Sequence, residues 1–302
     1  MKVKIYYCCL LLFLTLLNVS CGQEVETNAN LSQESDFPKA RIALAVSDLS
    51  IGTHRLAFGI IEPGIGSIKN DAVKLETFFI QDEKNPLLKE TLTAEFQEWP
   101  GGNKGVYTSI ATFDRAGKWG IGVTFETSNG LIERTSSVIE VTEKSLAPLV
   151  GHKAYPSKNI THAITNNINE LTTDPNPYYP LYEYSIEESI KERKFSLILF
   201  ASPAFCTTGT CGPQMDIVKT LHSDFSKEIV FIHVEIYENP AGMKGDISNA
   251  SLAQAVKDWN LPSEPWVFLV DDDGIIRHRF EGLATYQEIK AALIQNNFIT
   301  GK

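Results

Sequence analysis

Short hydrophobic runs separated by turn residues occupy the first half of the chain, from about residue 39 to 144. Apolar and polar residues alternate most clearly in Tyr107–Phe113, which is typical of a half-buried strand. Between the runs lie turn pairs such as Asn129-Gly130, a strong hairpin signal. The expected strands are Arg41–Val46, His54–Ile61, Val73–Ile80, Leu92–Glu98, Val106–Phe113, Trp119–Glu126 and Ser136–Val141.

These runs predict an all-β domain at residues 39–144. Seven short strands with turn signals between them suggest an immunoglobulin-like sandwich. The segment contains no cysteine, so a disulfide-based chemistry is not expected there. We interpret it as a binding module or spacer.

The pattern changes after about residue 182, where continuous apolar runs alternate with helix-spaced ones. Ser185–Lys194 predicts a short capped helix, and Phe195–Ala201 is typical of a strand buried on both faces. The later elements are expected at Met215–Phe225 (helix), Ile229–Ile236 (strand), Ser248–Trp259 (helix), Trp266–Val270 (strand), Ile275–Glu281 (strand) and Tyr286–Gln295 (helix). This order predicts an α/β domain at residues 182–302, and the prolines of residues 145–181 predict a linker before it.

The first 21 residues predict an export signal. Lys2 and Lys4 precede an apolar run of about 13 residues, Ile5–Leu17, which is short for a membrane span. The end of the segment, Ser-Cys-Gly at residues 20–22, resembles the lipobox of bacterial lipoproteins. That resemblance implies a lipid on Cys21, an anchor in a bacterial membrane and a location in the cell envelope. A plain secretory signal or an uncleaved anchor are the alternatives, and polar residues 22–38 predict a flexible tether.

Export reduces five cysteines to two. Residues 8 and 9 would leave with the signal and Cys21 would carry lipid, so Cys206 and Cys211 remain in a compartment where disulfides persist. The charge balance, 27 Lys and Arg against 37 Asp and Glu, gives a net charge of −10. This acidity argues against a general nucleic-acid binder, which needs a basic face.

Three features of the second half carry a resemblance to a known family. Cys-Gly-Pro at residues 211–213 follows a buried strand and opens a helix, Glu264-Pro265 precedes the strand Trp266–Val270, and Asp271–Gly274 forms a tight turn before the next strand. Residues 195–302 resemble the thioredoxin family. The resemblance implies a cis proline at Pro265 facing the cysteines. Gln214 stands where the family has its second cysteine, and Leu199 where it often has a buried acid.

The residues themselves predict thiol–disulfide exchange with exported proteins. A cysteine at a helix N-terminus has a stabilised thiolate, so we expect Cys211 to be the nucleophile and Cys206 the resolving thiol. With the cis peptide that the resemblance implies, Pro265 would place the backbone of Glu264 beside them, so we count Pro265 with Cys211 and Cys206 as a catalytic residue. The expected substrate-binding residues are Phe205, Pro213, Glu264 and Trp266. No cofactor is required by this chemistry.

Two other functions stay open. In one, Cys206–Cys211 is a static disulfide in a redox-silent binding protein, since paired cysteines of exported proteins are commonly structural. In the other, the protein handles copper as Sco-type chaperones do, with the two cysteines and His233 or His278 as ligands, because thiolate and imidazole suit Cu(I). Sco-type cysteines are spaced C-x3-C, whereas these are spaced C-x4-C.

Overall fold

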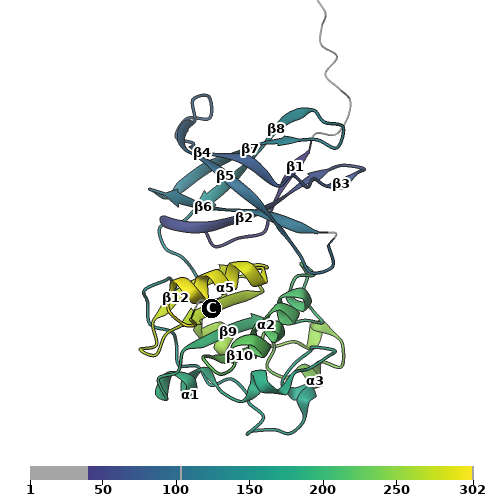
Figure 1. The fold of residues 1–302 in the computed structure, drawn as a ribbon, viewed down its shortest axis with the longest axis vertical. Helices are drawn as coiled ribbons and strands as arrows, with labels where there is room; N and C mark the ends of the chain where they lie inside the picture. The colour runs from purple at the N-terminus through teal and green to yellow at the C-terminus, as the bar shows by residue number, and fades with distance from the viewer. Residues whose placement is uncertain (1–39, 103, 301–302) are drawn as a thin grey trace, which may run out of the picture. The chain divides into compact units, whose positions relative to one another are not determined.

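The first half of the chain forms one antiparallel sheet (Figure 1). The computed structural model describes residues 40–102 and 104–300, so the expected signal, tether and lipid site at Cys21 lie outside it. The strands are β1 (Arg41–Leu44), β2 (Gly52–Glu62), β3 (Gly66–Ser67), β4 (Ala72–Phe79), β5 (Leu87–Glu98), β6 (Gly105–Phe113), β7 (Gly117–Glu126) and β8 (Ile132–Val141). Their order is β1-β2-β6-β5-β4-β7-β8, and β3 pairs with β2.

Strand β5 joins two groups of strands into this single sheet. Its first part pairs with β4, from Leu87 opposite Phe79 to Glu95 opposite Ala72. Its last part, Glu95–Glu98, pairs with β6. The groups β1-β2-β6-β5 and β4-β7-β8 follow the strand order of a constant-type immunoglobulin domain, but here pairing through β5 makes them continuous. The immunoglobulin-like assignment stays a prediction.

The second half contains a four-stranded sheet with helices on both faces. The strands are β9 (Ser196–Ala201), β10 (Val230–Glu235), β11 (Trp266–Val270) and β12 (Ile276–Glu281), in the order β10-β9-β11-β12. β10 runs parallel to β9, and the other two pairings are antiparallel. All residues of β9 and β11 are buried, which explains their continuous apolar sequences.

Alternate residues of β9 enter separate cores. Leu197 and Leu199 pack in the core that holds the buried sides of α2 (Cys211–Phe225) and α5 (Tyr286–Gln295). Ile198 and Phe200 point to the other core. That core contains residues of α1 (Ile186–Lys191) and α4 (Gln254–Asp258). The remaining helical segments are η1 (Ile168–Glu170), η2 (Tyr179–Tyr182), α3 (Pro240–Met243) and η3 (Ile247–Asn249).

One expected helix is wrong in extent. Ser248–Trp259 was expected to be continuous, but only Gln254–Asp258 is α-helical. Leu252 instead forms a β-bridge with Tyr237, and the Glu238 N–H donates to the Ser251 carbonyl at 2.9 Å. The chain is therefore extended beside the end of β10 where periodicity alone predicted a helix.

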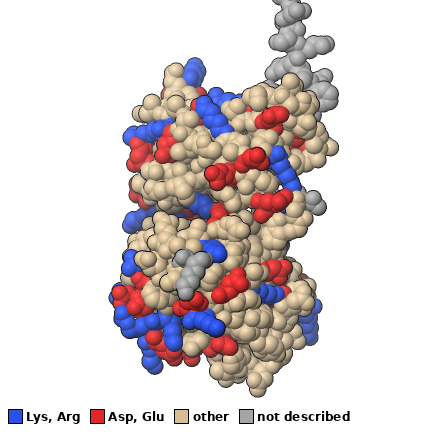
Figure 2. Space-filling model, viewed as in Figure 1, with Lys and Arg blue, Asp and Glu red and all other residues tan. Residues whose placement is uncertain are grey.

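The segment expected as a linker is part of the folded body. Ala147, Ala154 and Leu171 are buried, and the carbonyls of Ala147 and Pro148 accept hydrogen bonds from Arg279 of β12, both at 3.2 Å. All described residues fall in one compact unit. Acidic and basic side chains are interspersed on the face seen in Figure 2. Among the described residues, no helix is long and apolar enough to cross a membrane.

Candidate functional site

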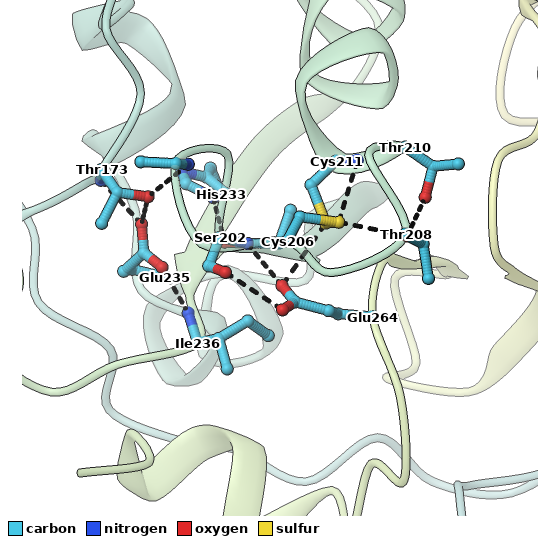
Figure 3. The surroundings of a disulfide bond; sticks show 12 residues. Thr173, Ser202, Cys206, Thr208, Thr210, Cys211, His233, Glu235, Ile236 and Glu264 are labelled. Atoms are coloured by element: carbon cyan, nitrogen blue, oxygen red, sulfur yellow. Dashed lines mark hydrogen bonds between the residues drawn. A yellow bond between two sulfur atoms is a disulfide. The ribbon is translucent and has the colours of Figure 1, made fainter. Parts of the chain in front are cut away.

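A disulfide lies where the chain passes from β9 into α2 (Figure 3). Cys206, in the connecting loop, is bonded to Cys211, the first residue of α2, with a Cα–Cα distance of 5.9 Å. The Cys211 N–H donates to Cys206 Sγ at 3.3 Å. Cys211 is fully buried and Cys206 only partly. A reagent in solvent therefore meets the sulfur of Cys206.

The helix itself favours a negative charge at Cys211. α2 has 15 residues, and its N-cap residue, Thr210, makes no side-chain capping bond. The first N–H groups of a helix lack partners within it, so its N-terminus carries a partial positive charge. A thiolate formed at Cys211 would lie against that end. Pro213 sits in this first turn and is partly buried.

A carboxyl group approaches the buried sulfur from the strand next to β9. Glu264–Pro265 is a cis peptide, and Glu264 Oε2 lies 3.4 Å from Cys211 Sγ. The Ser202 N–H and Oγ donate to this carboxyl at 2.7 and 3.1 Å. Burial raises the pKa of Glu264, and the Ser202 hydrogen bonds oppose that rise. The sequence predicted the backbone of Glu264 beside the cysteines, but not its side chain at the sulfur.

Two threonine hydroxyls form a chain that begins at Cys206 Sγ. Thr208 Oγ1 is 3.2 Å from Cys206 Sγ and 2.7 Å from Thr210 Oγ1. Hydroxyl groups rotate to donate or accept. Thr208 is therefore placed to donate to a thiolate at Cys206, and Thr210 can donate to Thr208.

A second acidic residue, Glu235, is linked to the cysteine loop through Thr173. Glu235, at the end of β10, accepts bonds from the Thr173 N–H at 2.7 Å and Oγ1 at 2.9 Å. Thr173 Oγ1 in turn accepts the Ala204 N–H at 3.2 Å. Burial raises the pKa of Glu235 to about 8. The one sequence signal for it is a carboxylate within the otherwise largely apolar run Ile229–Ile236.

The two histidines considered as metal ligands lie apart from this group. His233 Nε2 is 3.0 Å from the Ala201 carbonyl, which can only accept, so Nε2 carries the proton and Nδ1 accepts from Tyr182 at 2.8 Å. Burial lowers the pKa of His233 to about 4. His278 packs on the ring of Phe280, and burial lowers its pKa as well.

The chain offers a different set of ligand atoms near the cysteines. Among the described residues, Cys206, Cys211 and Glu264 form the one group whose ligand atoms all lie within 4.8 Å of one another. The disulfide must be reduced before either sulfur could bind a metal. Both ring nitrogens of His233 are already hydrogen-bonded. The residues around the cysteines therefore fit a Cu(I) site with imidazole ligands poorly.

The two aromatic residues expected to bind substrate, Phe205 and Trp266, offer less exposed apolar surface than the sequence suggested. Phe205 is partly buried and packs edge-on against Tyr237, with ring centroids 5.9 Å apart. Trp266 is only 1% exposed and stacks on Phe268. Its indole N–H donates to Ser263 at 3.1 Å. Trp266 therefore belongs to the core and leaves little surface for a substrate.

Comparisons with known proteins add nothing to this geometry. No family model and no curated protein matches the chain. Among solved structures, murine CRIg is matched over 34% of this chain and 95% of its own, with 8% identity and a TM-score of 0.20. A likeness of that size carries no argument about fold or function.

Proposed function

We propose that residues 182–302 are a thioredoxin-like domain whose Cys206–Cys211 pair exchanges thiols and disulfides with exported proteins. The observation that carries this proposal is the meeting of a disulfide, a helix N-terminus, a carboxyl and a cis proline at one point. We further propose that the β domain precedes it in an exported, membrane-tethered protein held by lipid on Cys21. The order β10-β9-β11-β12 is consistent with the proposed fold.

The burial of the two cysteines supports roles opposite to those expected from the sequence. Cys211 is fully buried, so an incoming thiolate attacks Cys206 Sγ. A new S–S bond forms there, the Cys206–Cys211 bond breaks, and its electron pair leaves on Cys211 Sγ, beside the helix N-terminus. Cys206 is thus the attacked residue and Cys211 the leaving and resolving thiol.

The exchange ends with a second thiol of the substrate. Its thiolate attacks the substrate sulfur in the mixed disulfide, and Cys206 leaves as a thiolate. The substrate has lost two electrons and gained a disulfide, and the cysteine pair has been reduced. The same steps in reverse reduce a substrate disulfide, with Cys206 attacking first and Cys211 closing the ring.

Glu264 is placed to handle the proton of Cys211. After reduction, the Cys211 thiol can donate to Glu264 Oε2, which lies 3.4 Å from the sulfur. As a carboxylate, Glu264 removes the thiol proton before ring closure. As a carboxylic acid, it returns a proton to the leaving thiolate. Its raised pKa brings both forms closer to neutral pH.

The first test is the reduction potential of the Cys206–Cys211 pair, measured against glutathione or dithiothreitol buffers. An exchanging pair is expected above about −300 mV, whereas structural disulfides of secreted proteins typically lie below that value. A potential below it would favour the alternative of a static bond in a redox-silent binding protein. The full burial of Cys211 is the observation that favours a static disulfide.

The second test separates the roles of the two sulfurs. With glutathione disulfide as the probe, Cys211→Ser should form a lasting mixed disulfide at Cys206, seen as added mass. Cys206→Ser should react roughly tenfold or more slowly, because access limits exchange at the buried Cys211. Faster labelling of Cys206→Ser than of Cys211→Ser would restore Cys211 as the first nucleophile.

A further inference from the structure

A cavity of about 540 Å³ adjoins the disulfide and reaches the β domain. One side is lined by residues of the first sheet, including Ala43, Gly59 and Val106. The other side is lined by Thr208, Thr210 and Glu264. We call this cavity the groove. Its volume lies within the range of about 300–1,000 Å³ that is usual for ligand pockets.

Neither cysteine lines the groove, but two of its lining residues contact the sulfurs. Thr208, in its wall, has its hydroxyl 3.2 Å from Cys206 Sγ. Glu264, also in the wall, has its carboxyl 3.4 Å from Cys211 Sγ. A group held at the end lined by Thr208 and Glu264 therefore lies one side chain away from the reacting bond, while the rest of the groove contacts the β domain.

The lining favours uncharged, apolar groups. The Glu281 carboxyl lines the groove but is fully engaged, since it accepts from the Ser47 and Asp48 N–H groups and from the hydroxyls of Ser47 and Ser263. Glu264 is half-buried and has a raised pKa. The one positively charged side chain among the described residues of the lining is that of Lys104, which is exposed. A glutathione molecule, with two carboxylates and an ammonium, finds little charge complementarity here.

We propose that the groove binds the apolar residues next to a reactive cysteine in an extended segment of an exported protein. The β domain then forms part of the substrate site rather than a spacer. This inference rests on the proposed exchange activity, because it is adjacency to Cys206 that gives the groove its role. The substrate class is thus a cysteine-containing peptide with small or medium apolar neighbours.

Gly59 allows the groove to be filled without straining the chain. It lies in β2, and a Cβ there would meet only Ile61 Cδ1 at 3.8 Å and the Ala43 carbonyl at 4.0 Å, both ordinary contacts. A Gly59→Val side chain would therefore occupy space in the groove. Gly120 of β7 provides a matched control. Its Cβ would also make ordinary contacts, of 3.5 Å or more, and it does not line the groove.

The experiment measures how fast synthetic thiol peptides reduce the disulfide of the full chain. In the wild type, a peptide with Leu and Val beside its cysteine should react about tenfold faster than one with Asp at both positions. Gly59→Val should lower the second-order rate constant for the apolar peptide by about tenfold, and that for dithiothreitol by much less, because dithiothreitol has no side chains to place in the groove. Gly120→Val should leave both rates unchanged.

The outcomes separate the two proposals. If dithiothreitol and the peptides all fail to reduce the disulfide, the proposed function itself is wrong. If dithiothreitol reacts but the peptide rates depend neither on flanking residues nor on Gly59→Val, only the groove inference is overturned. Should Gly59→Val fail to fold, Ala43→Leu fills the same groove from an exposed position of β1, and it must give the same selective loss.

Discussion

At the scale of single residues, Glu264 provides the carboxyl group near Cys211, since β9 contains no acidic residue. Position 199, where the thioredoxin resemblance places a buried acid, is a leucine in the core. The carboxyl comes instead from the residue before Pro265 and lies 3.4 Å from Cys211 Sγ. A general acid or base works best when its pKa lies near the working pH. Burial shifts the pKa of Glu264 in that direction.

Replacing Glu264 by glutamine should remove one limb of the pH–rate profile. As pH rises through the raised pKa of Glu264, the wild-type carboxyl loses its proton and becomes able to accept one from Cys211. Glu264→Gln should therefore resolve mixed disulfides about a hundredfold more slowly above that pKa. Stopped-flow rates between pH 5 and 9 test this, and two superimposable profiles would exclude a proton-transfer role.

The buried Glu235 gives stability a dependence on pH with a definite sign. Its pKa is raised from 4.5 to about 8 by burial. Between these values the folded protein holds a proton that the unfolded chain releases, so raising the pH favours unfolding. Burial lowers the pKa of four histidines, whose titration raises the free energy of unfolding as the pH approaches 6.5: His54, His222, His233 and His278. Between about pH 6.5 and 8 the contribution of Glu235 remains, so the free energy of unfolding should fall there, and Glu235→Gln should make this fall smaller.

Urea unfolding of the oxidised protein at several pH values provides the measurement for Glu235. Titration of His233 below pH 6.5 affects the wild type and the variant equally, so it cancels in the comparison. The exposed Glu238, three residues along the chain, is the matched control. Glu238→Gln should keep the wild-type dependence on pH. An equal slope in Glu235→Gln would contradict the assignment.

At the scale of elements, the start of α5 is fixed by a capping box that also contacts the first sheet. Thr285 and Glu288 form a capping box, with the Thr285 N–H donating to Glu288 Oε2 at 2.9 Å. The other oxygen of Glu288 accepts from Arg55 Nε of β2 at 2.8 Å. One carboxylate thus caps the helix and binds the first sheet to the second.

Loss of the cap should cost little compared with loss of this carboxylate. Thr285→Ala is expected to lower the free energy of unfolding by about 1 kcal/mol, and Thr285→Ser by much less. Glu288→Ala removes the cap and also leaves Arg55, whose side chain is 8% exposed, without its partner. Its cost should be larger, about 3 kcal/mol. Thermal or urea unfolding of the three variants should give this order, and equal losses would contradict it.

The sequence predicts elements better than contacts between them. Alternation in β6 and the continuous apolar run of β9 follow from the faces they bury, so both strands were expected close to their observed bounds. The helix expected at Ser248–Trp259 was too long, because Leu252 bridges to Tyr237, and such pairing leaves no periodic signal. The carboxyls of Glu264 and Glu235 reach the cysteine loop through tertiary packing, which spacing along the chain does not encode.

At the scale of the whole molecule, Arg279 of β12 holds the two sheets and the connecting segment together. Its guanidinium pairs with Asp48 at 3.2 Å, with the two side chains 9% and 2% exposed. It also donates to Ser145 Oγ at 2.8 Å. The Leu146 N–H donates to the same Asp48 carboxyl at 2.8 Å, and Ser145 Oγ donates to it as well.

Breaking this buried pair from one side should be costly. Asp48→Leu leaves the guanidinium buried without a counter-charge, which typically costs about 3–5 kcal/mol of the free energy of unfolding. Replacing both partners, as Asp48→Leu with Arg279→Met, should recover much of that loss because neither charge is then stranded. A double-mutant cycle by urea unfolding measures the coupling, and additive losses would show that the pair is not coupled.

The buried contacts of Arg279 with Asp48 and Ser145 also constrain the evolution of this sequence. A substitution at position 48 should cost less when position 279 changes with it, and the same is expected of the buried pair Arg55 and Glu288. The two halves therefore cannot be exchanged freely with other partners as independent modules. Among descendants of a common ancestor, we expect positions 48 and 279, and positions 55 and 288, to co-vary across the boundary between the sheets.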